Sequence, residues 1–228
     1  MTSAMPKSVT IHLEDGQRVS GLLHTRRRPR ACYVFAHGAG AGMDHPFMAA
    51  VAAGLAERGI AALRFQFLYM ERGAKRPDPP KLAQAAVRAA VTEAGQLLPE
   101  VPLITGGKSF GGRMVSQAQA ESPLPGVRGI AFLGFPLHPA GRPSDDRGAH
   151  LLDVKVPMLF LQGTRDALAD VELLRQLVGR LGARATLKLL QGADHSFHVP
   201  ARTGRTDADV LAEMLDAFVA WIDTVTRA

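Results

Sequence analysis

The chain has 228 residues, of which 46% are hydrophobic, enough for one sizeable domain with a continuous core. No run of eighteen apolar residues occurs, which excludes a membrane-spanning helix, and residues 1–8 lack the apolar segment of a secretory signal. The single cysteine, Cys32, excludes an internal disulfide and lies in an apolar run, where we expect a buried thiol. We therefore expect one domain over residues 1–228, located in the cytoplasm.

The charge balance is basic, with 27 lysines and arginines against 21 acidic residues and a net charge of +6. The densest basic cluster, at residues 26–30, lies between two strand-like segments, where a solvated loop is the simplest interpretation. Aromatic residues are not interleaved with the basic ones, as they are on surfaces that stack nucleic-acid bases. We expect no nucleic-acid or membrane partner, no metal or cofactor, and a monomer or homodimer.

The predicted strands begin with a hairpin. Residues 9–13 alternate apolar and polar side chains, as do residues 19–23, and Asp15-Gly16 between them is typical of a tight turn. Residues 31–36 form a continuous apolar run, which is typical of a buried parallel strand. Five further strands are predicted in this way, at residues 60–65, 101–105, 129–135, 158–161 and 186–190.

Helical periodicity separates these strands. Apolar residues recur at three- and four-residue steps over 47–55, 171–181 and 210–221, and Pro80 begins an alanine-rich helical stretch to residue 98. An antiparallel hairpin followed by alternating strands and helices predicts an α/β fold. We expect an eight-stranded, mostly parallel sheet with helices on both faces and no cap domain.

A serine flanked by glycines follows the predicted strand 101–105. The segment Gly107-Lys-Ser-Phe-Gly111 suits a strand that turns sharply into a helix, with the hydroxyl of Ser109 exposed above the sheet. Ser109 also suits the simpler role of a helix N-cap. A phosphate-binding loop would need glycine where Pro102 stands, so that alternative fails.

Small residues 37–42 follow the first buried strand. They allow backbone N–H groups to point at a developing oxyanion, and we assign the two donors to Ala39 and Phe110. The alternative is a dinucleotide-binding turn, which needs glycine in place of Met43. It also needs an acidic residue at the end of the next strand, which instead ends at Phe65.

An acid and a base occur after later strands. Asp166 follows the strand 158–161 and His195 follows the last strand, so that nucleophile, acid and base come in the order Ser109, Asp166, His195. That order is typical of a Ser-Asp-His triad on an α/β sheet, in which His195 takes the proton of Ser109. Asp170 is the alternative acid and His198 the alternative base.

These residues resemble the α/β-hydrolase superfamily, and the compact length is similar to its capless, dienelactone-hydrolase-like branch. Residues 37–47, 106–114 and 162–166 are similar to a bacterial group related to a testis-expressed protein and to a subunit of the nonspecific-lethal chromatin complex. The resemblance implies a Ser-Asp-His hydrolase and no particular substrate. Dienelactone hydrolase proper has a cysteine nucleophile, so its lactone chemistry is not implied.

The predicted site is open. About twenty residues separate the strands 129–135 and 158–161, which is too few for a lid and favours a small or exposed acyl ester or thioester. The cations Lys108, Arg113 and Arg165 favour an anionic substrate, unless the arginines pair with local carboxylates.

The alternative function is a catalytically silent binding or scaffold protein. Weaker expectations for substrate contacts are His37, Asp44, His45, Tyr69, Met70 and Lys108.

Overall fold

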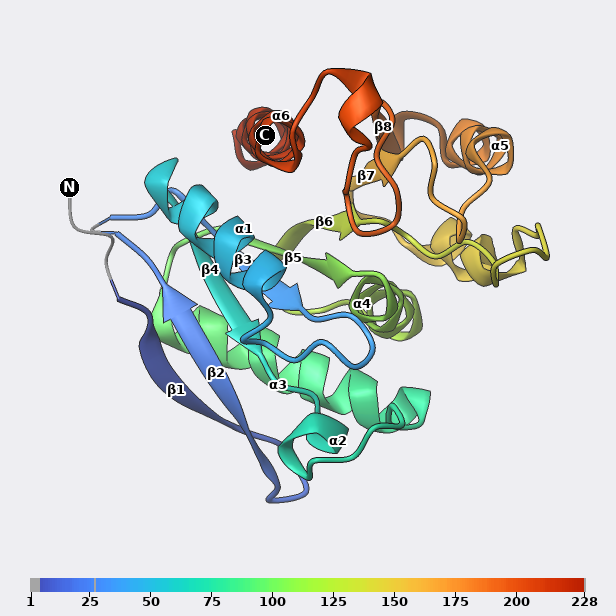
Figure 1. Cartoon of the computed structure of the whole chain (residues 1–228). Helices are drawn as coiled ribbons and strands as arrows, with labels where there is room; N and C mark the ends of the chain where they lie inside the picture. Colours follow the sequence, from blue (N-terminus) through green and yellow to red (C-terminus); the bar gives the residue numbers. More distant parts are fainter. Residues whose placement is uncertain (1–4, 27, 228) are drawn as a thin grey trace.

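An eight-stranded sheet forms the centre of the computed structural model, which describes residues 5–26 and 28–227 (Figure 1). The strand order is β1-β2-β4-β3-β5-β6-β7-β8. Strand β2 pairs antiparallel with both β1 and β4, and the remaining pairs are parallel. The strands are β1 Lys7–His12, β2 Arg18–His24, β3 Ala31–Ala36, β4 Ile60–Phe65, β5 Leu103–Lys108, β6 Val127–Leu133, β7 Met158–Gly163 and β8 Ala185–Leu190.

Eight strands and an antiparallel hairpin confirm the predicted sheet, with shifted boundaries. Strand β5 runs on to Lys108, three residues past the predicted end, because Gly106 and Gly107 still pair with both neighbouring strands. Strand β6 ends at Leu133, two residues early, because Gly134 adopts a φ of 70°, which is outside the β region. Arg27 of the basic cluster and residues 1–4 lie outside the described residues.

Helices cover both faces of the sheet, as predicted. Helices α1 and α6 pack on one face, while α3, α4 and α5 pack on the other (Figure 1). Side chains of β3 alternate between the two cores, with Cys32 and Val34 on the α3 side and Tyr33 and Phe35 on the α1 side. The helices are α1 Pro46–Glu57, α2 Leu68–Glu71, α3 Pro80–Leu97, α4 Phe110–Glu121, α5 Val171–Leu181 and α6 Asp207–Thr226.

Helix boundaries follow capping more closely than periodicity. Helix α6 begins at Asp207, three residues before the predicted start, because Thr206 and Asp209 form a reciprocal capping box. The short α2 was not predicted, since four residues are too few for a periodic pattern. Between β6 and β7 the chain adds only the 3₁₀ segment η1 Asp146–Asp153, which packs against α4. The connection therefore holds no cap domain.

The strand order places a crevice at the carboxyl ends of the central strands. Strand β3 lies between β4 and β5, so the chain leaves β3 toward one side and later returns to its other side. Loops after β3 and β5 therefore diverge, and in open α/β sheets such a switch point is where ligands bind. The loop after β3 and Ser109 at the end of β5 both lie at this point.

Two further expectations were that the Cys32 thiol is buried and that no helix spans a membrane. Cys32 is fully buried, and burial raises the pKa of its thiol to about 12. Within the described part of the chain, none of the helices combines the length and apolarity needed to cross a bilayer.

Candidate active site

Ser109 occupies a strained turn between β5 and α4. Its φ of 50° and ψ of −116° are unfavourable for a residue with a Cβ atom. A Cβ on Gly107 would lie 2.5 Å from the carbonyl oxygen of Ala36, and one on Gly111 would lie 2.6 Å from it. Both flanking glycines are therefore required by close approach to the neighbouring strand, as the sequence predicted.

The structure brings Ser109, His195 and Asp166 into one chain of hydrogen bonds. His195 Nε2 lies 2.9 Å from Ser109 Oγ, and His195 Nδ1 lies 2.6 Å from Asp166 Oδ2. The carboxylate can only accept, so Nδ1 carries the proton and Nε2 is left to accept from the serine hydroxyl. This arrangement prepares the imidazole to remove the proton of Ser109.

Asp166 is held by more than the histidine. Its side chain is fully buried, and Gln162 Nε2 donates to Oδ2 at 2.6 Å while the N–H of Leu168 donates to Oδ1 at 2.8 Å. Gln162 is itself fixed, because its Oε1 accepts from the N–H of Phe135 at 2.9 Å. Gln162 was not predicted as a site residue, although it is the first polar residue after an apolar strand core.

The alternative acid and base have other roles. Asp170 caps α5, its Oδ1 accepting from the backbone N–H groups of Glu172 and Leu173. His198 is exposed and its Nδ1 lies 2.9 Å from Asp207 Oδ2. Neither side chain takes part in the hydrogen bonds of Ser109.

A pocket of about 210 Å³ opens beside the serine hydroxyl. Its wall is formed by the loop after β3, the start of α1, the β5–α4 turn and the loop after β8. Five of the lining residues were not individually predicted as site residues: Gly38, Ala41, Phe47, Met48 and Ser196. The lining residues are Gly38, Ala39, Ala41, His45, Phe47, Met48, Lys108, Ser109, His195 and Ser196.

The two expected oxyanion donors flank Ser109. Ala39 lines the pocket, and Phe110 is the first residue of α4, where backbone N–H groups have no acceptor within the helix. The loop that carries Ala39 is fixed from below: the N–H of Gly40 donates to the Tyr69 hydroxyl at 2.9 Å, and the N–H of Met43 donates to Gln66 Oε1 at 2.8 Å. A fixed loop can present an N–H without reorganisation.

The expected substrate contacts divide into two groups. His45 and Lys108 line the pocket. His37 does not: it is fully buried, its Nδ1 donates to the Gly38 carbonyl, and its Nε2 accepts from the N–H of Phe67 at 3.1 Å. Burial also lowers the pKa of His37, which keeps the ring neutral. The prediction that His37 contacts substrate is therefore wrong; the side chain instead supports the loop after β3.

Three other expected contacts also lie outside the pocket wall. Tyr69 is almost completely buried and its hydroxyl accepts from the N–H of Gly40. Met70 lies so near Gly42 that an added Cβ there would be 3.3 Å from Met70 Cε, and Asp44 is exposed. Sequence placed these residues on the correct loops, but the direction of each side chain depends on the neighbouring loop over which it packs.

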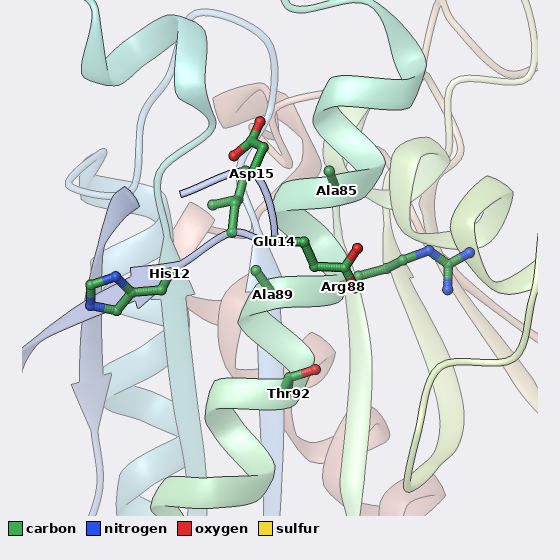
Figure 2. A pocket seen from close by; sticks show the side chains of 8 residues that line it. His12, Glu14, Asp15, Ala85, Arg88, Ala89 and Thr92 are labelled. Carbon is green, nitrogen blue, oxygen red and sulfur yellow. The ribbon is translucent and has the colours of Figure 1, made fainter. Parts of the chain in front are cut away.

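A second pocket, of about 310 Å³, lies between the tip of the β1–β2 hairpin and α3 (Figure 2). Its floor includes Ala85 and Ala89, and Figure 2 shows the side chains of His12, Asp15 and Arg88 pointing away from one another. It therefore lacks the converging reactive groups of the pocket at Ser109. Across residues 5–26 and 28–227, no group of three or more His, Cys, Asp and Glu side chains could hold a metal ion.

Comparisons with known proteins agree with this architecture. A family model described as alpha/beta hydrolase domain matches residues 29–223. The chain is similar to the esterase domain of a Rhodothermus marinus protein, at 20% identity over 98% of this chain and 100% of that chain, with a TM-score of 0.74. It is also similar to a lidless α/β serine hydrolase from Xanthomonas campestris, at 20% identity over 97% of each chain and a TM-score of 0.73. A dienelactone hydrolase from Anabaena variabilis gives 20% identity over 97% of this chain and 99% of that chain, with a TM-score of 0.74.

Proposed function

The chain belongs to the alpha/beta hydrolase family, and on that basis we propose that it is a serine hydrolase cleaving a small or exposed acyl ester or thioester. The observation that carries the proposal is the unbroken hydrogen-bond path from Asp166 through His195 to Ser109, which ends beside an open pocket. The esterases and serine hydrolases among its structural neighbours support the same reaction class.

Acylation begins at the serine hydroxyl. Ser109 Oγ attacks the acyl carbon and forms the Oγ–C bond, while its proton moves to His195 Nε2. Asp166, already bonded to Nδ1, stabilises the imidazolium that results. The tetrahedral intermediate then collapses: the bond to the leaving alcohol or thiol breaks, and the leaving group takes the proton from His195.

The negative charge on the carbonyl oxygen needs donors. The backbone N–H groups of Ala39 and Phe110 are our candidates, because one lies in the pocket wall and the other begins α4. Water then attacks the acyl-enzyme and gives a proton to His195. The Oγ–C bond breaks, Ser109 regains its proton, and the carboxylic acid leaves.

Pocket size sets the expected substrate. About 210 Å³ is below the roughly 300 Å³ at which typical small-molecule pockets begin, and the connection between β6 and β7 adds no covering domain. A long lipid chain would find too little apolar wall. Short acyl groups, or acyl groups presented at the surface of a larger molecule, fit the space.

A small panel of 4-nitrophenyl esters and thioesters, from acetyl to octanoyl, tests the proposal. We expect the highest kcat/KM for short acyl groups, and a loss in kcat on the order of a thousandfold or more in Ser109→Ala. Ser116→Ala serves as a matched control, since that serine lies in α4 and bonds to His150 instead. No turnover on any member by folded protein, together with a stable complex recovered from cells, would favour the scaffold alternative.

A further inference from the structure

Lys108 places a cation in the pocket next to the nucleophile. It is the last residue of β5, directly before Ser109, and lines the pocket with a half-buried side chain. Its Nζ donates to the backbone carbonyl of His195 and lies 5.2 Å from the centre of the Phe197 ring. These two contacts hold the ammonium against the loop that carries the catalytic base.

Within the described part of the chain, this cation forms no ion pair. No carboxylate oxygen of the described residues lies within ion-pair distance of Lys108 Nζ. The two carboxylates whose charges act on it already accept other bonds. Asp166 accepts from Gln162, His195 and the N–H of Leu168, and Asp194 accepts from the N–H groups of Ser196 and His198.

An unpaired ammonium in this position is unfavourable in the free protein. Burial lowers the pKa of Lys108 to about 8, although the charges of Asp166 and Asp194 act to raise it. An ammonium has three N–H donors, and one of those of Lys108 donates to a protein oxygen, the carbonyl of His195. A ligand oxygen with negative charge would supply the missing partner.

We propose that Lys108 is a specificity-determining residue that binds a negatively charged group on the substrate, so that the preferred substrates are anionic acyl esters or thioesters. This inference rests on the proposed serine-hydrolase function and names its substrate class. The pocket geometry supports it, because His195 bonds on one side to Ser109 Oγ and on the other, through its carbonyl, to Lys108 Nζ. An anionic group therefore meets the ammonium within the same small pocket as the reacting carbonyl.

Matched ester pairs test the inference. The first pair is 4-nitrophenyl hemiglutarate and 4-nitrophenyl pentanoate, with the charge on the acyl part. The second is the acetyl ester of 4-hydroxybenzoate and that of its methyl ester, with the charge on the leaving group. The quantity measured is the ratio of kcat/KM for the anionic ester to that for the neutral ester within each pair.

We expect the wild-type ratio in at least one pair to fall roughly tenfold or more in Lys108→Met, and to be largely kept in Lys108→Arg, because a hydrogen bond between two charges is worth about a tenfold preference or more. Lys155→Met is the matched control: it removes the same charge at an exposed position whose Nζ donates to the carbonyl of Leu152. Its ratio should equal that of the wild type.

A parallel loss on both members of each pair in Lys108→Met, with the ratio unchanged, would overturn the inference and assign Lys108 to support of the His195 loop. That result leaves the hydrolase proposal standing, because turnover persists in the wild type. Absence of both turnover and covalent labelling of Ser109 in folded wild-type protein would instead overturn both.

Discussion

At the scale of single residues, the site depends on three side chains whose contacts leave little freedom. The imidazole of His195 is fixed at both nitrogens, by Asp166 Oδ2 at 2.6 Å and by Ser109 Oγ at 2.9 Å. The carboxylate of Asp166 is fixed in turn by Gln162. The acid therefore selects the tautomer of the histidine as well as its orientation.

Asp166→Asn tests this role. The amide keeps the size of the side chain but can donate to Nδ1, which favours the tautomer with the proton on Nε2 and removes the acceptor for the serine hydroxyl. We expect kcat to fall on the order of a thousandfold or more, with little change in folding. Asp170→Ala is the control, since Asp170 caps α5: it should cost about 1 kcal/mol in unfolding free energy and leave kcat near the wild-type value. Near-normal turnover in Asp166→Asn would contradict the assignment.

Lys108 predicts a pH effect on selectivity. Its pKa is lowered to about 8 by burial, so the ammonium is present below pH 8 and is lost as the pH rises through that value. The ionisable groups that face it are the carboxylates of Asp166 and Asp194 and the residue His195, whose backbone carbonyl accepts from Nζ. Any effect on the chemical step that both esters of a pair share cancels in the ratio.

The anionic-to-neutral ratio of kcat/KM should therefore be highest near pH 7 and decline between pH 7 and 9.5. Lys108→Arg should show no such decline, because arginine stays charged over this range. A wild-type ratio that is constant to pH 9.5 would contradict the role of this ammonium.

At the scale of elements, the turn from β5 into α4 sets the position of the nucleophile. The strained Ser109 backbone persists because glycines on either side allow β3 to approach closely. A Cβ on Gly111 would lie 2.6 Å from the carbonyl oxygens of both Ala36 and His37. These are backbone atoms of a central strand and its loop, so they cannot move aside cheaply.

Gly111→Ala should consequently destabilise the fold by about 3 kcal/mol, as expected for overpacking against backbone. Urea unfolding measures the change. Gly179→Ala is the matched control: this glycine lies in α5, and the added Cβ would meet no atom within 4 Å apart from its chain neighbours and the backbone of its own helix, so alanine should stabilise by roughly 0.5–1 kcal/mol through helix propensity. Equal effects of the two substitutions would show that the close approach at Gly111 is not a constraint.

Strand ends proved the most predictable part of the site. Apolar runs mark buried strands, and the carboxyl ends of parallel strands meet at one edge, so the sequence alone predicts that Ser109, Asp166 and His195 lie together, as they do. The direction of loop side chains could not be predicted. His37 points into the core because the N–H of Phe67, on another loop, needs an acceptor. Gln162 was missed because a single glutamine at a strand end has no pattern of its own.

At the scale of the whole molecule, the two faces of the sheet are packed independently, and the site lies where loops from both halves of the sheet meet. One core joins the sheet to α3, α4 and α5, and the other joins it to α1 and α6 (Figure 1).

The excess of basic side chains is partly neutralised by surface ion pairs, such as that of Arg58 with Asp216 on α6. Within the described residues no ion pair is formed by Arg113, by Arg165 or by Lys108. Of these three cations, Lys108 alone lines the pocket at Ser109.

Covalent labelling by a fluorophosphonate probe, located by peptide mass spectrometry, tests the central claim most directly. An activated serine at the meeting point of three distant segments should give one label per chain, on Ser109. The label should be absent in Ser109→Ala and form at least a hundredfold more slowly in His195→Ala, because general-base assistance is worth about that much. Folded wild-type protein that takes no label, or takes it on another residue, would contradict the account.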